Sequence, residues 1–322
     1  MPSKSQLSVE IKNLVFAAGF HNVGISAVRP LNKSVYMEQW INYNKHGTMQ
    51  WMEKNLEKRL DITKLYPEAR SVISVAHNYY SGFQHSSDSR KAKISRYAWG
   101  KDYHKIIKKK LKKVLNEIKI LNPSVNGRIF VDTAPIQDKL WAEQAGIGWQ
   151  GKNTNILNRQ MGSWFFLGEI VIDKDLEYDQ PAVDYCGSCR ACIDACPTNA
   201  LEPYIIDATK CISYLTIEYW DQPIPADYES KLNNWVFGCD ICQDVCPWNK
   251  FAVETDEPGY LPSEGNVLPD LEELDHLTED QFKKRFSKSP VSRTKYKNFI
   301  RNVRTVMKNI NPKSTTLRES KP

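Results

Sequence analysis

The chain has 322 residues, 41% of them hydrophobic, and a mean hydropathy of −0.53, so we expect a globular protein of two or three domains. No apolar run approaches the roughly 18 residues of a membrane helix, and the start "MPSKSQLSVE" lacks a signal-peptide pattern. These features favour a soluble cytoplasmic protein that does not bind membranes, in which cysteines serve as metal ligands rather than as disulfides.

The net charge of +6 is distributed unevenly. Residues 90–113 hold eleven Lys and Arg against one acid, and residues 283–322 hold thirteen against one. The segment 186–246 has nine acids against three bases. Two basic regions around an acidic segment suggest a polyanionic partner. The alternative is a solvated helix face, because the apolar positions between 107 and 118 form one helical stripe.

Residues 1–180 have the pattern of a mixed α/β domain. Helical spacing is found at 9–20, ending near Gly19, and at 137–146, ending at Gly146. Residues 70–80, 127–136 and 165–173 are rich in β-forming residues and predict three strands.

Two further segments complete the predicted α+β architecture. Residues 181–250 form a short, turn-rich segment with cysteines, typical of a chain held by metal rather than by a large core. Residues 251–322 begin with a Pro/Gly/acid stretch and continue as a basic helical segment. The predicted domains are therefore 1–180, 181–250 and 251–322.

The cysteine spacing is the most specific motif. "CGSCRACIDACP" (186–197) has the bacterial four-iron, four-sulfur spacing C-x2-C-x2-C-x3-C-P, and "CDICQDVCP" (239–247) repeats it with one cysteine fewer. In two-cluster ferredoxins the last cysteine of each run ligates the other cluster, and Cys211 is the one cysteine left to complete the second set. The predicted ligand sets are Cys186, Cys189, Cys192 and Cys246 for one [4Fe-4S] cluster, and Cys196, Cys211, Cys239 and Cys242 for the other.

Two structural zinc sites, each with four thiolates, are the main alternative, and disulfides are a third. Zinc sites usually have separated C-x2-C pairs and do not require a proline after the last cysteine, so the spacing favours clusters.

Clusters relay single electrons, so another centre must perform the chemistry, and residues 1–180 are the part of the chain that could hold it. That part contains no G-x-G-x-x-G fingerprint and no Walker P-loop, which argues against nicotinamide and ATP. A flavin or another redox cofactor remains open at this point.

Four motifs in order carry a resemblance to a known family. "SRYAWGKDYHKII" (95–107), "FVDTAPIQDKLWAEQAGIGWQGKNT" (130–154), "GSWFFLGEIVID" (162–173) and the paired cysteine motifs resemble the epoxyqueuosine reductases. The resemblance implies a nitroreductase-like cobalamin-binding domain joined to a two-cluster ferredoxin-like module. It also implies reduction of epoxyqueuosine to queuosine at the wobble position of tRNA, and kinship with the reductive dehalogenases.

The resemblance also implies roles for individual residues. Asp132 would be the proton donor, with a pKa raised by partial desolvation, although an Asp after a β-run is otherwise a turn cap. His104 is expected to be structural, because Ile107 occupies the place of the glycine in the D-x-H-x-x-G corrinoid motif. The expected cobalamin contacts are Arg59, Ser95, Asp132, Asn153 and Ser213.

The implied partners are the anticodon stem-loop of tRNA and an external low-potential electron donor, and we expect a monomer. Basic residues among Tyr97, Trp99 and Tyr103 fit a surface for RNA. The alternative function is a reductive dehalogenase-like or other iron–sulfur oxidoreductase acting on a small molecule. A nucleic-acid-binding module with structural zinc is a third class.

Overall fold

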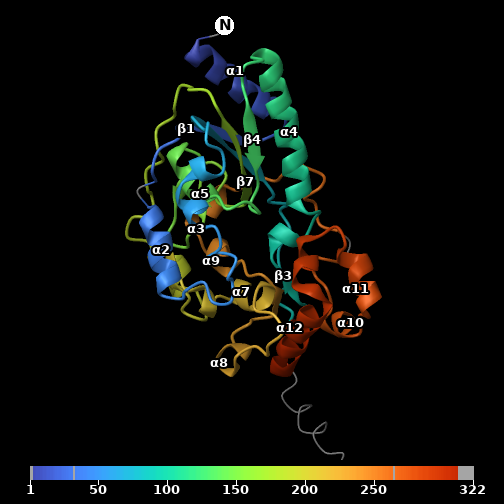
Figure 1. The fold of residues 1–322 in the computed structure, drawn as a ribbon. Helices are drawn as coiled ribbons and strands as arrows, with labels where there is room; N and C mark the ends of the chain where they lie inside the picture. The colour runs from blue at the N-terminus through green and yellow to red at the C-terminus, as the bar shows by residue number, and fades with distance from the viewer. Residues whose placement is uncertain (1–2, 32, 264, 311–322) are drawn as a thin grey trace, which may run out of the picture.

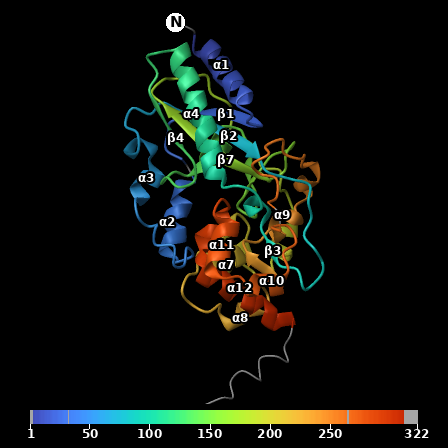
Figure 2. The same cartoon turned by 90° about the vertical axis from the view of Figure 1, so that its right-hand side faces the viewer.

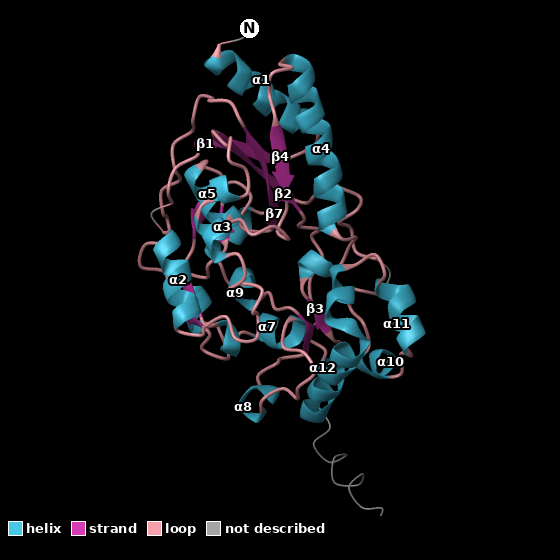
Figure 3. Ribbon diagram, viewed as in Figure 1, coloured by secondary structure: helices cyan, strands magenta, loops and turns pink. Residues whose placement is uncertain are grey.

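The computed structural model describes residues 3–31, 33–263 and 265–310, and a four-stranded antiparallel sheet is at the centre of their N-terminal half (Figures 1 and 3). The two inner strands are rich in β-branched and aromatic residues and are almost entirely buried, as expected for a sheet covered on both faces. In spatial order the strands are β1 (Asn22–Ala27), β2 (Ser71–Asn78), β7 (Phe165–Ile172) and β4 (Gly127–Phe130). All three predicted β-runs therefore contain a strand of this sheet.

Helices α1 (Lys4–Ala17) and α4 (Tyr103–Leu121) cover one face of the sheet (Figure 2). The helix α4 begins where the side chain of Asp102 accepts a hydrogen bond from the backbone N–H of His104. Its buried residues are Ile107, Leu111, Val114, Leu115 and Ile118, the stripe that the helical period predicts. The remaining face of α4 presents its lysines to solvent.

Helix α5 (Asp138–Gln144) covers the opposite face. Its Trp141 packs with Val72 and Val171, and the small side chain of Ala142 allows the helix to pack near Ala76. Preceding it in the chain are α2 (Ser34–Asn42) and α3 (Leu56–Leu60), and following it are the paired short strands β5 (Trp149–Gln150) and β6 (Ile156–Leu157). The predicted helices at 9–20 and 137–146 are confirmed.

A second hydrophobic core joins three segments that are far apart in the chain. Residues 92–99, 208–237 and 271–306 contribute to it, and β3 (Lys93–Ile94) pairs in parallel with β10 (Trp235–Phe237). Its helices are α7 (Ile212–Ile217), α8 (Ala226–Glu229), α10 (Leu271–Asp275), α11 (Glu279–Phe286) and α12 (Lys295–Ile310). This core crosses the predicted boundaries at 180 and 250, so the division into three domains stays a prediction.

The two cysteine motifs lie side by side. Each contains one short helix, α6 (Ala191–Asp194) or α9 (Ile241–Asp244), and these two helices contact each other. A small hairpin of β8 (Leu201–Glu202) and β9 (Ile205–Ile206) follows the first motif. In the part of the chain that the structure describes, no helix combines the length and the apolar character needed to cross a bilayer.

Candidate active site

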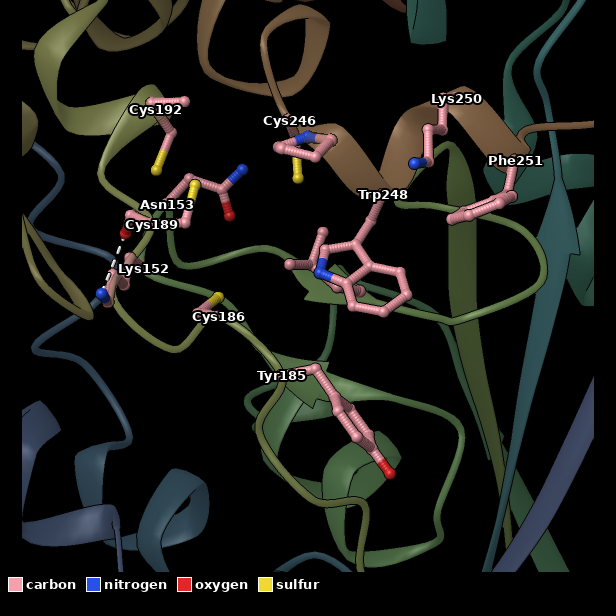
Figure 4. Close-up of a pocket in the computed structure, with 13 residues that line it drawn as sticks. Lys152, Asn153, Tyr185, Cys186, Cys189, Cys192, Cys246, Trp248, Lys250 and Phe251 are labelled. Carbon is pink, nitrogen blue, oxygen red and sulfur yellow. Dashed lines mark hydrogen bonds between the residues drawn. The ribbon is translucent and has the colours of Figure 1, made fainter.

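The first group of cysteines surrounds one cavity. Cys186, Cys189, Cys192 and Cys246 line a space of about 310 Å³, into which their sulfur atoms point (Figure 4). The Nζ of Lys152 donates hydrogen bonds to the carbonyl oxygens of Gly187 at 2.6 Å and Cys189 at 2.9 Å, which holds the loop between the first two cysteines. The structure thus gathers the four residues expected for one cluster, while their ligation of iron stays a prediction.

The second group consists of Cys196, Cys211, Cys239 and Cys242, which influence one another electrostatically. Burial raises the pKa of Cys242, and the charges of Cys211 and Cys196 add to that effect. Burial likewise raises the pKa of Cys211 and of Cys239. Buried thiols ionise only where a positive centre compensates the charge, and the irons of a cluster would do so. Within the described ranges, no three His, Cys, Asp or Glu side chains are spaced to hold a single metal ion.

A buried charge network attaches the second group to the N-terminal half of the chain. Asp240, between Cys239 and Cys242, is 1% exposed and accepts hydrogen bonds from the Ser95 hydroxyl and from the backbone N–H of Arg96 at 2.9 Å. The Arg96 guanidinium donates to Asp240 at 3.2 Å and to Asp244 at 2.6 Å. Burial raises the pKa of Asp240, but these partners and His85 outweigh it and bring the pKa below its ordinary value.

Three of the expected cobalamin contacts lie against the cysteine groups. The Ser95 hydroxyl is engaged by Asp240, and the Nδ2 of Asn153 donates to the carbonyl oxygen of Cys242 at 3.2 Å. The backbone N–H of Ser213 donates to the thiol of Cys211 at the start of α7. These contacts explain how the three residues are positioned, and their role in binding a cofactor stays a prediction.

Asp132 lies on the loop after β4, in a left-handed backbone conformation with φ of 47°. Its Oδ2 accepts a hydrogen bond from the Tyr103 hydroxyl at 2.7 Å and lies 3.1 Å from the Nε2 of His104. The Nδ1 of that imidazole lies 2.7 Å from Oδ1 of Asp102. The first turn of α4 therefore holds Asp132 through two successive hydrogen bonds, between Asp102 and His104 and between His104 and Asp132.

The hydrogen bonds between Asp102, His104 and Asp132 shift the pKa values of these groups. Burial raises the pKa of Asp132, but hydrogen bonds from His104 and Tyr103 bring it below its ordinary value. The expected rise assumed a corrin and a nucleoside beside the carboxyl and stays a prediction for that complex. Burial also lowers the pKa of His104, yet its bonds to Asp102 and Asp132 raise it to about 9. Near neutral pH the proton therefore resides on His104. These contacts join His104 to Asp102 and Asp132, and the interpretation of His104 as a structural residue stays a prediction.

Three charged residues surround Asp132 and connect it to the second cysteine group. The pKa of Arg59 is lowered by burial and raised by Asp138 and Asp132, which places this expected cofactor residue at the site. Burial, followed by the charge of Asp132, raises the pKa of Asp138 to about 6. Burial lowers the pKa of Lys139, and the charges of Asp138, Cys242, Asp132 and Cys211 oppose that effect.

The sequence did not indicate that Tyr103, Asp138 and Lys139 lie near Asp132. Tyr103 and His104 occupy the first turn of α4, so the only signal was the capping residue Asp102 before a strongly periodic helix. Asp138 and Lys139 begin α5 and read as an ordinary helix start. Nothing in the spacing indicates that the starts of α4 and α5 meet at the loop after β4.

The expected basic surfaces differ from each other. In the described residues the C-terminal segment pairs most of its cations with acids, as in Arg293–Glu218, Lys297–Asp221, Arg304–Asp275 and Lys308–Glu229. On α4, Lys110 pairs with Glu257, whereas Lys105, Lys109 and Lys112 are exposed and form no ion pair among the described residues. Trp99, one of the aromatics within the basic segment 90–113, is fully buried. Lys284, Lys288 and Lys295 of the C-terminal segment are also exposed without an ion pair in the described residues, so α4 carries the denser part, but not the whole, of the unpaired basic surface.

The fold and the two cysteine groups define a redox protein with two iron–sulfur motifs. Residues 185–249 match the family model described as "4Fe-4S double cluster binding domain", which favours clusters over zinc. Residues 59–133, which include Asp132, match the model "Epoxyqueuosine reductase QueG, DUF1730".

Full-length relatives identify the family. An epoxyqueuosine reductase of Leadbetterella byssophila is 49% identical over 92% of this chain and 97% of its own length. One from Cellulophaga algicola is 45% identical over 94% of this chain and 99% of its own. The chain therefore belongs to the epoxyqueuosine reductase family.

Solved structures agree with this assignment. An epoxyqueuosine reductase crystallised with a tRNA-Tyr epoxyqueuosine-modified tRNA stem loop has a TM-score of 0.87 and 29% identity, covering 97% of this chain and 84% of that chain. The enzyme from Bacillus subtilis, at 28% identity and the same TM-score and coverage, is described with an aspartate catalytic loop swung out of its active site.

His104 should titrate near pH 9 rather than near 6.5 in an NMR titration of its ring signals. Because the folded pKa is raised, the stabilisation from this imidazolium is complete below pH 6.5 and is lost as the pH rises through about 9. Asp102→Asn removes a hydrogen-bonded charge and should shift the midpoint down. His77, whose pKa burial lowers to about 3, is the internal comparison and should stay neutral. A midpoint at or below 6.5 in the unaltered protein would contradict the ion pairs.

Proposed function

We propose that this protein reduces epoxyqueuosine to queuosine at the wobble position of tRNA, with electrons passing through two [4Fe-4S] clusters to cobalamin and a proton delivered by Asp132. The observation that carries the proposal is the cavity into which the sulfur atoms of Cys186, Cys189, Cys192 and Cys246 point, in a chain that matches epoxyqueuosine reductases over most of its length. The tRNA substrate would place the reaction in the cytoplasm, with an external low-potential donor, and we propose a monomer.

The donor chemistry fits the proposed clusters. Eight thiols fall into two neighbouring groups of four, those around the cavity of Figure 4 and those around Cys211. The crossed pairing is supported because Cys246 of the second motif lines the same cavity as Cys186, Cys189 and Cys192. Hydrogen bonds from the backbone of Ser213 and Tyr214 to Cys211 favour the charged sulfur that ligation requires.

The polar side chains of the residues near Asp132 suit the binding of cobalamin. The Nε of Arg59 is buried and has no hydrogen-bond partner in the described residues, so it can donate to a bound group. Arg59, Ser213 and Asn153 would hold the cofactor between Asp132 and the second cysteine group. When bound, cobalamin supplies a strongly reduced metal centre and the clusters supply it with single electrons.

The chain itself supplies the proton and its position. Departure of the epoxide oxygen as water takes two electrons and two protons, and the carboxyl of Asp132 is the group proposed to protonate that oxygen. Tyr103 and His104 fix this carboxyl, and the proton held by His104 near neutral pH can return Asp132 to its acid form. Reduction of a small molecule is not favoured, since the relatives matched along their whole length are epoxyqueuosine reductases.

Changing Asp132 to Asn should keep the clusters and cobalamin but lower queuosine formation by about two to four orders of magnitude, the usual range for a general acid. Turnover is measured on tRNA carrying epoxyqueuosine under saturating reductant. Asp175→Asn is the matched control, because Asp175 is 52% exposed against 53% for Asp132 and pairs only with Lys4. Normal turnover in Asp132→Asn with cofactors retained would contradict the proposed role.

Changing Cys211 to Ala should remove about half of the iron or leave a three-iron cluster, because one of two four-ligand sets loses a thiolate. Cys246→Ala is the paired variant and should damage the other cluster. Iron analysis with EPR spectra of the two reduced variants should therefore show complementary damage. Two intact clusters in Cys211→Ala would exclude the crossed assignment.

Changing Lys105, Lys109 and Lys112 together to Ala should lower the salt dependence of tRNA binding by about 0.7–0.9 log–log slope units for each phosphate that is no longer neutralised. The control changes Lys297, Arg304 and Lys308, which alters the charge equally but removes cations already paired with acids. Binding is followed by fluorescence anisotropy over a salt series. Equal slopes for the α4 variant and the unaltered protein would show that α4 is only a solvated face.

A further inference from the structure

An exposed tryptophan with two guanidinium neighbours lies near Asp132. Trp51, in the turns between α2 and α3, is 43% exposed, and the guanidinium carbons of Arg59 and Arg293 lie 5.5 Å and 5.9 Å from the centre of its ring. We call Trp51, Arg59 and Arg293 the Trp51 platform. It joins the segment between β1 and β2 to the segment that precedes α12, so no sequence motif contains it.

The platform is held in place. Arg293 donates two hydrogen bonds to the carboxylate of Glu218, at 2.6 Å and 3.1 Å, and this carboxylate is mostly buried. Glu218 in turn accepts a hydrogen bond through its carbonyl oxygen from Thr48, three residues before Trp51. A ring and cation fixed before binding lose little entropy when a ligand arrives.

The platform borders the site of the reaction. The Nε2 of Gln137, five residues after Asp132, donates a hydrogen bond to the carbonyl oxygen of Arg59 at 3.0 Å, which ties the platform to the segment that carries Asp132. The pKa of Arg293 is raised by Glu218 and, to a smaller extent, by Asp132, whereas burial lowers the pKa of Arg59 against the charges of Asp138 and Asp132. Both cations of the platform are therefore electrostatic neighbours of the carboxylate proposed as proton donor. We therefore expect the part of a substrate that adjoins the group at Asp132 to lie toward Trp51.

An exposed indole beside two fixed guanidiniums suits one chemical class in particular. Nucleic-acid bases stack on aromatic rings, and the phosphates that join them pair with Arg. A free apolar ligand would leave the cations unused, and Trp99, the tryptophan inside the basic segment 90–113, has no exposed ring to offer.

We propose that Trp51 stacks on the anticodon-loop base next to the wobble nucleoside, with the Nη1 of Arg293, the nitrogen that Glu218 does not engage, donating to the adjoining phosphate. This inference rests on the proposed function, because it takes the wobble nucleoside to be the group that reaches Asp132. It assigns base-stacking to the platform and long-range attraction to the lysines of α4.

The first test measures the affinity of the holoenzyme for a synthetic, unmodified anticodon stem-loop RNA. Trp51→Ala should weaken binding by about 5- to 150-fold, the range for loss of one base–aromatic stack, and Trp51→Phe should retain most of the affinity. Because indole carries no charge, Trp51→Ala should leave the salt slope unchanged. Phe16→Ala is the matched control: Phe16 is 50% exposed and belongs to α1, far from α7 in both views of the ribbon (Figures 1 and 2).

The second test identifies the stacked base. Each loop base is replaced in turn by an abasic nucleotide, and every RNA is measured against the unaltered protein and against Trp51→Ala. One abasic position beside the wobble nucleotide should weaken binding to the unaltered protein and have no further effect on Trp51→Ala. Additive effects at every position would overturn the platform.

Two further outcomes decide between the proposals. Unchanged affinity in Trp51→Ala, while the unaltered protein forms queuosine, would overturn the platform and leave the proposed function intact. If Trp51→Ala weakens RNA binding as expected but the unaltered protein forms no queuosine, the proposed function alone is overturned. Loss of cobalamin absorbance in Trp51→Ala would also overturn the platform, because the ring would then belong to the cofactor site.

Discussion

The buried ion pair of Arg96 and Asp240 is the interaction on which the arrangement of this protein depends. Both side chains are almost fully buried, at 3% and 1% exposure, so each charge requires the other and the hydrogen bonds from Ser95 and His85. Removing one partner of such a pair typically costs about 3–5 kcal/mol, because the other charge is left uncompensated. Since Asp240 lies between Cys239 and Cys242, this pair fixes the second cysteine group relative to the sheet-bearing half of the chain.

Fixing the second cysteine group also fixes the environment of Asp132. Lys139 on α5 is within electrostatic range of both, and α5 packs directly on the sheet. The loop after β4 therefore presents Asp132 at a set position beside the cysteines. Its left-handed backbone costs some strain, which the bonds from Tyr103 and His104 offset. In the proposed reaction Asp132 is ionised at rest and becomes an acid when His104 returns a proton to it. The same carboxyl is therefore available in every turnover.

Local patterns predicted the parts of the fold that local physics determines. The apolar stripe of α4, the β-runs of the sheet and the spacing of the cysteines each depend on residues close in the chain. The network around Asp240 joins residues about 144 positions apart, and neither Ser95 nor Arg96 has a spacing that indicates its partner. The same limit applies to His104, whose link to Asp132 depends on how the starts of two distant elements meet.

Charge counts along the chain predicted a polyanion-binding surface but could not assign it to the right element. The acids of the segment 186–246 lie against the basic C-terminal segment, and pairs such as Arg293–Glu218 and Lys308–Glu229 cancel much of the charge of both. The densest part of what remains is the face of α4, whose Lys108 reaches Thr133 beside Asp132. Arg293 differs from the other paired cations of the C-terminal segment, because its pair with Glu218 holds its guanidinium beside the Trp51 ring. Under the two proposals, α4 attracts the RNA and the Trp51 platform places one base, and both act on a substrate that reaches Asp132.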